Sequence, residues 1–463
     1  MGIFLNPGNE NFARTLSAKI YVDKTNMLSV LNGLMKSPNN YVCLSRPRRF
    51  GKTIAGNMIS AYYSKGCDSR ELFLPYKIAS DASFGENLNK FNVIKVDLNG
   101  FYSALEDKSS VFSEFTRRVK REFAEEFTDI DFSECVSIAN CIEDVFRKKS
   151  EQFVIIIDEY DVIVRDNPTD EILEKYREFL ISLFKNADLA PAIALSYITG
   201  ILPVMRDKIQ SKLNNFDEYT MLYPADFAQY FGFTRDEVGA LCEKYGVDFA
   251  ECQNWYDGYK MLWYENGEKK SCEVYNPESV VKTMYSHKFG NYWNRTSTYA
   301  VISDRIAHNF DGTQDDVVRM IAGESVDVNV TTYKNTMDSF VTKSDVYTYL
   351  LHLGYLAYNE EDETCRIPNN EVRKEWLNVA ETDKDFSVTD RIVKSSKILL
   401  AEVLKGNAEL VASSLDESHI HVTSNRSYNN EDALQSAIYL SFIYALNKYT
   451  CVKEMTAGKT GRK

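Results

Sequence analysis

The sequence SRPRRFGKT at residues 45–53 follows a short apolar run at Tyr41–Leu44 and precedes a helical pattern that begins at Lys52. A strand, a loop and a helix N-terminus in this order bring backbone N–H groups together around an anion. In such a loop a glycine lets the backbone approach the phosphates, a lysine reaches the β and γ oxygens, and a hydroxyl coordinates Mg²⁺. Gly51, Lys52 and Thr53 supply these groups, so the stretch predicts a site for a nucleoside triphosphate and Mg²⁺.

The loop departs from the usual phosphate-binding motif at its first position. That motif begins with glycine, whereas this chain has Arg46 there. For the residues Gly-Lys-Thr alone, a basic turn without a nucleotide is an equally good interpretation. The predicted nucleotide-binding residues of the loop are Arg46, Pro47, Arg48, Arg49, Phe50, Gly51, Lys52 and Thr53.

An acidic pair at the end of a second apolar run supports the nucleotide hypothesis. Phe153–Ile157 is a run of large apolar residues that is followed directly by Asp158 and Glu159. Ligands bind at the carboxyl ends of strands in open α/β sheets, so these carboxylates are well placed. We expect Asp158 to hold Mg²⁺ and Glu159 to orient and polarise the attacking water. The alternative is a buried strand that ends in solvated acids.

A third strand is expected beside the strand of the phosphate loop. Ala192–Thr199 is apolar and ends in Thr199 and Gly200. The Thr199 hydroxyl is a candidate sensor of the γ phosphate, and it completes a predicted catalytic set with Glu159 and Lys52. A hydroxyl that satisfies local backbone at a strand end is an equally good interpretation of Thr199.

The alternation of apolar runs with longer helical patterns in residues 1–225 predicts an α/β fold with a parallel sheet between helices. The expected strands are Tyr41–Leu44, Val93–Asp97, Phe153–Asp158 and Ala192–Thr199. Each strand lacks alternation of polar and apolar residues, as a strand buried on both faces should. Glu114–Phe127 and Glu171–Phe184 are the expected crossover helices.

Smaller units are expected after residue 225. In residues 226–295, Thr234 and Glu237 form a capping box for a short helix, and a hairpin leads into a helix near Pro277. In residues 296–385, a helix ends at Gly354, and a strand, a turn, a strand and a helix follow, an order that suggests a small α+β or winged-helix unit. Residues 386–463 are expected to contain two amphipathic helices and a strand, at Asp390–Leu415, Glu431–Leu446 and Tyr449–Met455.

Composition argues against several classes of protein. The 463 residues carry a formal charge of −13, which argues against a protein that coats nucleic acid or anionic membrane with its whole surface. Nine cysteines without a Cys-x-x-Cys pair fit a reducing cytoplasm, and no apolar stretch is long enough to span a membrane. The close pair His419 and His421 lacks further ligands at metal-binding spacing.

The order of motifs along the chain resembles the bacterial AAA-ATPase-like family, whose members usually continue into a nuclease-superfamily domain of the PD-(D/E)xK type. The motifs are YVDKTNML at 21–28, SRPRRFGKT at 45–53, LFLPYKI at 72–78, FVIIIDEYD at 153–161, ITGILPV at 198–204, LNN at 213–215, WYDGY at 255–259, YNPESV at 275–280 and IPNNEVR at 367–373. The resemblance implies an additional-strand P-loop core with a winged-helix-like extension, and ATP as the nucleotide. It also implies that arginine is usual at Arg46, and that Asp23 and Lys24 line the adenine side.

The C-terminal sequence resembles only the beginning of the nuclease fold. SNRSYNNEDAL at 424–434 is similar to its opening helix, with Glu431 as the first metal-facing acid. A second carboxylate is needed to share a catalytic metal, and the chain stops before one appears. We therefore expect a truncated segment without nuclease activity.

The sequence leaves alternatives to an ATPase open. One is a slow or non-hydrolysing nucleotide switch, because no arginine can be assigned as a finger and Arg206 is only the nearest candidate. Another is a protein that binds DNA through the winged-helix-like segments. Besides ATP, the expected partners are DNA or another protein, an oligomer is compatible with the sequence, and no membrane partner is expected.

Overall fold

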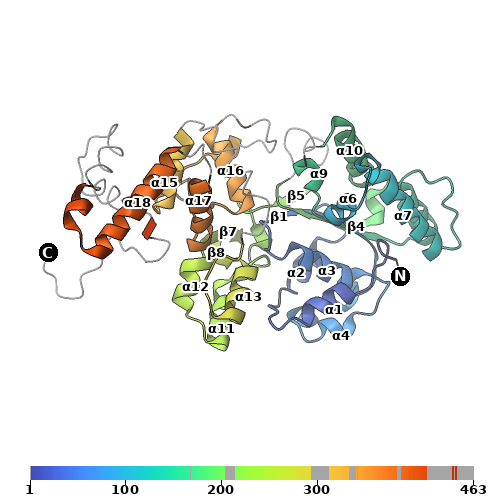
Figure 1. Ribbon diagram of the computed structural model, residues 1–463. Coiled ribbons are helices and arrows are strands. Elements are labelled where there is room, and N and C mark those ends of the chain that lie inside the picture. The colour runs from blue at the N-terminus through green and yellow to red at the C-terminus, as the bar shows by residue number, and fades with distance from the viewer. Residues whose placement is uncertain are drawn as a thin grey trace.

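A five-stranded parallel sheet forms the centre of the N-terminal unit (Figure 1). The computed structural model describes residues 2–166, 168–203, 214–293, 312–332, 340, 342–382, 387–413, 415, 441, 442, 444 and 445. The strands are β1 (Tyr41–Ser45), β2 (Asn92–Asp97), β3 (Phe153–Asp158), β4 (Ile193–Gly200) and β5 (Asp217–Tyr219). Their order is β2-β3-β4-β1-β5 and all neighbours are parallel.

The sheet order confirms the prediction that the strand ending in Thr199 lies beside the strand of the phosphate loop. Strand β4 lies between β1 and β3, in register from Tyr41 opposite Ser196 to Ser45 opposite Gly200. The four predicted strands agree with the structure to within one residue at each end. Strand β5 was not predicted, because it is three residues long and only partly buried, and so has no apolar run.

Helices cover both faces of the sheet (Figure 1). One face packs against α7 (Val111–Glu126), α8 (Ile138–Lys149) and α10 (Asp170–Phe184). The other face packs against α2 (Met27–Leu34) and α3 (Lys52–Tyr63). Alternate residues of β3 enter the two cores, which explains why the strand is apolar throughout. Helices α7 and α10 confirm the predicted crossovers.

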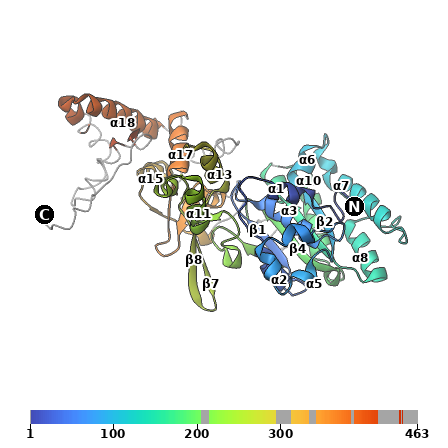
Figure 2. The ribbon, with the colours of Figure 1, turned by 90° about the horizontal axis from the view of Figure 1, so that it is seen from below.

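The next region begins with the predicted capping box. Thr234 and Glu237 cap α11 (Arg235–Tyr245), with each side chain bonded to the backbone of the other residue. Helix α12 (Phe249–Tyr256) and a three-stranded antiparallel sheet follow. Its strands are β6 (Phe233–Thr234), β7 (Tyr259–Glu265) and β8 (Glu268–Tyr275). The β7–β8 hairpin projects from the middle of the molecule (Figure 2) and leads into α13 (Pro277–Ser286), as predicted.

The third region shows the predicted order of helix, strand, turn, strand and helix. Its elements are α15 (Thr313–Ile321), β9 (Val326–Asp327), α16 (Lys343–Leu353), β10 (Ala357–Asn359), β11 (Thr364–Arg366) and α17 (Asn370–Thr382). Gly354 ends α16 with a φ of 84°, a left-handed conformation that glycine adopts without strain. Both views place α15 and α17 on the side of the molecule away from α7 (Figures 1 and 2).

The predicted helix Asp390–Leu415 is wrong in its bounds. Helix α18 covers Ser387–Lys405, and Gly406 follows it with a φ of 73°. A left-handed glycine stops the intrahelical hydrogen bonding, which periodicity alone did not reveal. The predicted helix Glu431–Leu446 lies mostly, and the strand Tyr449–Met455 wholly, outside the described residues.

A buried carboxylate joins the second and third regions. Glu371 of α17 is 1% exposed and accepts hydrogen bonds from the Ser279 hydroxyl at 2.8 Å and from the backbone N–H groups of Tyr292 and Trp293 at 2.7 and 3.1 Å. Burial raises the pKa of Glu371 to about 7, which these hydrogen bonds only partly oppose. The two regions are thus held together by a group that pays a desolvation penalty when it is ionised.

We expect Glu371→Gln to change the free energy of unfolding differently at two pH values. The change should be more favourable at pH 8 than at pH 4.5 by about 3 kcal/mol. The folded-state pKa lies above the ordinary value, so the parent loses stability as the pH rises through about 7, whereas the neutral amide does not titrate. Urea unfolding at both pH values measures the difference. Glu409→Gln, at an exposed position, is the control, and equal effects of Glu371→Gln at both pH values would contradict the assignment.

Candidate nucleotide-binding site

The loop between β1 and α3 has a backbone conformation that suits an anion. Arg49 and Gly51 have φ values of 69° and 93°. A Cβ on Gly51 would meet no atom within 4 Å, so the backbone conformation, rather than lack of space, favours glycine there. Helix α3 starts directly at Lys52, and its first N–H groups face the loop. The predicted strand, loop and helix are therefore present.

Lys52 lies at the centre of the site and brings the loop to the acidic pair. Its side chain is 5% exposed, and Nζ donates to the carbonyl oxygens of Arg46 and Pro47 at 3.0 Å each. The same Nζ lies 3.9 Å from Oε1 of Glu159. Burial lowers the pKa of Lys52, while the negative charge of Glu159 opposes that shift. The two motifs thus meet in space, although 106 residues separate Lys52 from Asp158 (158 − 52).

Asp158 and Thr53 form an oxygen-rich pair at the carboxyl end of β3. Asp158 is 1% exposed and accepts a hydrogen bond from the backbone N–H of Glu159 at 3.0 Å, with the Thr53 hydroxyl nearby. Burial raises the pKa of Asp158 to about 6, against the opposing effect of the nearby Thr53 hydroxyl. A nearby cation would favour the ionised carboxylate.

The donor set fits Mg²⁺. This ion commonly binds through one or two protein oxygens and completes its octahedron with water and substrate phosphates. Among the described residues no group of three or more His, Cys, Asp or Glu side chains could hold a metal ion without such help. Thr53 and Asp158 would hold the ion, which would supply charge neutralisation at the phosphates.

Glu159 is held by an arginine that the sequence prediction missed. Its Oε2 accepts a hydrogen bond from Nη2 of Arg165 at 2.7 Å. Glu159 has a φ of 54°, which is uncommon for a residue with a side chain and is often found at functional sites. Arg165 ends the short helix α9 (Val162–Arg165), which comes soon after the acidic pair in the sequence. This closeness in sequence is the signal that could have revealed it.

The Thr199 hydroxyl satisfies local backbone in this structure. It is buried, and it donates to the carbonyl oxygen of Leu44 at 2.8 Å. This bond joins the ends of β4 and β1 and corresponds to the alternative that the sequence left open. A role of Thr199 in sensing the γ phosphate stays a prediction.

Arg46 contacts the edge of the sheet with its side chain. It is fully buried, and Nη1 donates to the carbonyl oxygens of Ser45 and Tyr219 at 2.8 and 3.0 Å. The guanidinium lies 5.5 Å from the ring centre of Phe231, and burial lowers its pKa to about 10. Only the backbone carbonyl of Arg46, which accepts from Lys52, is seen at the phosphate loop.

The remaining loop residues contact the regions after residue 225. Arg49 forms an ion pair with Glu278 of α13. Phe50 is buried against the ring of Tyr259, with centroids 5.6 Å apart, and its carbonyl oxygen accepts from the N–H of Gly232 at 3.2 Å. A Cβ on Gly354 would lie 2.9 Å from Pro47, and Arg48 is partly exposed. The outer side of the loop is therefore an internal interface.

Asp23 and Lys24 make structural contacts. Asp23 accepts from the backbone N–H groups of Thr25 and Lys77, both at 2.9 Å. Lys24 donates to the carbonyl oxygen of Gln229 at 2.7 Å and to Oε2 of Glu237 at 2.6 Å. The bond to Glu237 joins the N-terminal segment to α11, and a contact of Asp23 or Lys24 with adenine stays a prediction.

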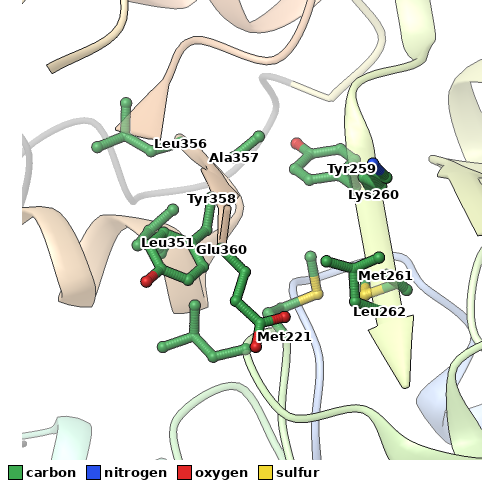
Figure 3. A pocket seen from close by; sticks show the side chains of 11 residues that line it. Met221, Tyr259, Lys260, Met261, Leu262, Leu351, Leu356, Ala357, Tyr358 and Glu360 are labelled. Atoms are coloured by element: carbon green, nitrogen blue, oxygen red, sulfur yellow. The ribbon is translucent and has the colours of Figure 1, made fainter. Parts of the chain in front are cut away.

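A separate hollow lies beyond the loop, between β7 and β10 (Figure 3). It is lined by Met221, Leu222, Tyr259, Lys260, Met261, Leu262, Leu351, Leu356, Ala357, Tyr358 and Glu360. Tyr259, which packs on Phe50, forms part of its wall. The hollow is therefore one side chain away from the phosphate loop, and the loop itself does not line it.

The sheet order, the left-handed loop glycine and the meeting of Lys52 and Thr53 with the acidic pair define a P-loop nucleotide-binding fold. Residues 8–210 match the profile of a family described as "AAA-ATPase_like: Predicted AAA-ATPase". This match supports the resemblance to that family that the motifs predicted, over residues 8–210. The match ends before the regions that were expected to resemble a winged helix and a nuclease.

The chain is also similar to a curated protein from Azotobacter chroococcum mcd 1, described as "Uncharacterized protein in vnfD 5'region". The two are 25% identical over 291 residues, which are 61% of this chain and 52% of that protein. The chain thus matches about half the length of this relative.

Among solved structures, the chain is similar to the ORC2 protein of Aeropyrum pernix in ADPNP and ADP complexes. The TM-score is 0.35 and the identity 12%, over 80% of this chain and 98% of that chain. For PCH-2 of C. elegans the TM-score is 0.23 and the identity 10%, over 80% and 72% of the two chains. Both scores are low, and the fold is assigned from the sheet order of this chain.

Several predicted features fall outside this description of the site. Arg206, His419, His421 and Glu431 lie outside the described residues. Within the described residues, no helix is both long and apolar enough to cross a membrane.

We expect Lys24→Met to lower the free energy of unfolding by about 1 to 2 kcal/mol, because it removes charge-assisted hydrogen bonds to Glu237 and Gln229. Affinity for ATP should stay close to that of the parent, because the side chain is engaged by α11. Chemical denaturation and fluorescent-nucleotide titration measure the two effects, with the surface variant Lys244→Met as control. Lost affinity with unchanged stability would instead place Lys24 at the nucleotide.

Proposed function

We propose that the protein binds and hydrolyses Mg-ATP, and that the nucleotide state repositions the regions after residue 225. The observation that carries the proposal is the meeting of two motifs at one end of the sheet. Nζ of Lys52 lies 3.9 Å from Oε1 of Glu159, and the Thr53 hydroxyl is near enough to Asp158 to lower the pKa of that carboxyl. A phosphate-binding cation, a pair of Mg²⁺ ligands and a carboxylate that can orient water are the groups this chemistry requires.

Each side chain has a distinct role in the proposed reaction. Lys52 would exchange the carbonyl oxygens of Arg46 and Pro47 for the β and γ oxygens of ATP. The N–H groups at the start of α3 would stabilise the phosphates. Oε1 of Glu159 would accept a hydrogen bond from the attacking water, because Oε2 already accepts from Arg165. Bound Mg²⁺ would neutralise the charge that develops on the phosphates.

The contacts on the outer side of the loop support coupling to the C-terminal regions. A change in loop conformation on nucleotide binding would act on the Arg49–Glu278 ion pair and on the Phe50–Tyr259 contact. Packed interfaces tend to have discrete arrangements, so a small displacement can be transmitted as a rigid-body movement. Tyr259 also donates to the carbonyl oxygen of Gly354 at 2.5 Å, which extends the path to α16.

We expect Glu159→Gln to lower ATP turnover about 100-fold or more while ATP still binds, because the amide is a poor acceptor for the attacking water. Lys52→Ala should weaken ATP binding about tenfold or more, because it removes a charge-assisted contact to phosphate. Phosphate release and fluorescent-nucleotide titration measure these effects.

Lys90→Ala, which removes an exposed lysine, is the matched control and should behave like the parent. Equal turnover in the parent, Lys52→Ala and Glu159→Gln proteins would remove the proposed ATPase. Tight ATP binding without turnover by the parent would instead indicate a nucleotide-dependent switch.

Tryptophan fluorescence offers a direct test of the coupling. All four tryptophans lie after residue 225, at Trp255, Trp263, Trp293 and Trp376. We expect Mg-ATP to change their emission in the parent, and Glu278→Gln to reduce the change because it weakens the ion pair with Arg49. ATP affinity should shift by no more than about fivefold, since a partly exposed ion pair contributes at most about 1 kcal/mol.

Lys282→Gln is the matched control for Glu278→Gln, because Lys282 forms an ion pair with the same carboxylate and leaves Arg49 in place. An emission change of equal size in the parent and in Glu278→Gln would exclude this ion pair as the coupling contact.

DNA binding receives no support from the charges of the β7–β8 hairpin. Two of its three lysines, Lys269 and Lys270, form ion pairs with Glu361 and Glu268 at 2.8 and 2.9 Å. Binding to phosphates needs basic groups that are available to replace counterions. We therefore favour contacts of the hairpin with other parts of this protein over contact with nucleic acid.

A further inference from the structure

Arg165 is a partly buried arginine beside the carboxylate that would orient the attacking water. It ends helix α9, six residues after Glu159, and its side chain is 16% exposed. Nη2 donates to Oε2 of Glu159 at 2.7 Å, and Nε lies 2.9 Å from Oδ2 of Asp161. Burial alone would lower the pKa of Arg165, but the carboxylates of Asp161 and Glu159 raise it above its usual value.

Asp161 fixes the position of this arginine. Its side chain is 3% exposed, and Oδ2 accepts hydrogen bonds from the backbone N–H groups of Ile201 and Leu202 at 3.1 and 3.0 Å. These two residues directly follow β4, which lies between β1 and β3. The guanidinium therefore forms an ion pair with a carboxylate that is itself held by the backbone just after β4.

The ion pair with Arg165 leaves Glu159 with one carboxylate oxygen that can accept a hydrogen bond from water. Oε2 is taken by Arg165, whereas Oε1 faces Lys52 at 3.9 Å, at the side of the phosphate loop. Without the arginine, the attraction of Lys52 could rotate the carboxylate out of place, since the glutamate side chain has several rotatable bonds. A carboxylate that orients water must hold its geometry closely, because a displacement of about 1 Å can cost about 100-fold in rate.

We propose that Arg165 is a positioning residue that fixes Glu159 with Oε1 directed to the attacking water. The inference rests on the proposed ATPase function and assigns a residue that neither nucleotide motif contains. Both of its described ion pairs are with carboxylates of its own segment, so the inference assigns Arg165 to Glu159 rather than to the phosphates.

The anchor also connects Glu159 to the third region. Ile201 and Leu202 belong to the hydrophobic core that contains Val346 and Leu350 of α16. A shift of α16 would therefore displace the N–H groups that hold Asp161, and with them Arg165. The position of the carboxylate is thereby sensitive to the packing of the C-terminal regions on β4.

The test compares steady-state ATP hydrolysis by the full chain and by Arg165→Met, Arg165→Lys and Arg147→Met. We expect Arg165→Met to lower kcat by about 100-fold and to change KM by less than about threefold, since Glu159 does not bind the ground state. Arg165→Lys should recover part of the lost kcat, because lysine keeps the charge but not the planar fork. Arg147→Met removes an exposed arginine that pairs with Asp144, and it should match the parent.

The outcomes separate this inference from the proposed function. No turnover by the parent would remove both. Turnover by the parent that Arg165→Met leaves unchanged or increases would overturn the positioning role alone, as would a change confined to KM. If Arg165→Met does not fold, as judged by its thermal transition and ATP binding, Arg165→Lys decides the question, because an unchanged kcat in that variant also overturns the inference.

Discussion

The pairing of charges at the carboxyl end of the sheet is the constraint on which the rest of the structure depends. Five charged side chains lie there and are largely buried, those of Lys52, Asp158, Glu159, Asp161 and Arg165. Buried charges are stable only when they are paired and hydrogen-bonded. The sheet order makes the pairing possible, because β4 between β1 and β3 separates the loop from the acids by one strand. The loop and the acidic pair can then act on one ligand.

The phosphate loop is also an interface with the regions after residue 225. One side of the loop presents N–H groups and Lys52, whereas Pro47, Arg49 and Phe50 contact Gly354, Glu278 and Tyr259. A ligand on the inner side and a movement on the outer side would therefore share one short backbone segment. Because Glu159 is held by Arg165, whose anchor rests on β4, the acidic side has a connection of its own to the third region.

Much of the fold could be predicted from the sequence, because strands buried on both faces and capped helices leave local signals. The apolar run Phe153–Asp158 and the capping box at Thr234 are examples. Contacts between distant residues leave no such signal: the bonds of Arg46 to Tyr219 and of Lys24 to Glu237 each span more than a hundred residues. Motif spacing therefore predicted candidate residues for the site, but it did not predict the contacts that Arg46 and Lys24 make with distant segments.

The burial of Arg46 limits how this loop can be exchanged with other phosphate loops. Its guanidinium bonds the carbonyl oxygen of Tyr219 in β5, while its Nε and Nη2 have no hydrogen-bond partner among the described residues. Glycine, the usual residue at that place, has no donors that could reach the strand and would leave a void beside Phe231. A loop transplanted from a glycine-type protein would bring its phosphate chemistry but detach the outermost strand, so recombination has to move the loop and β5 together.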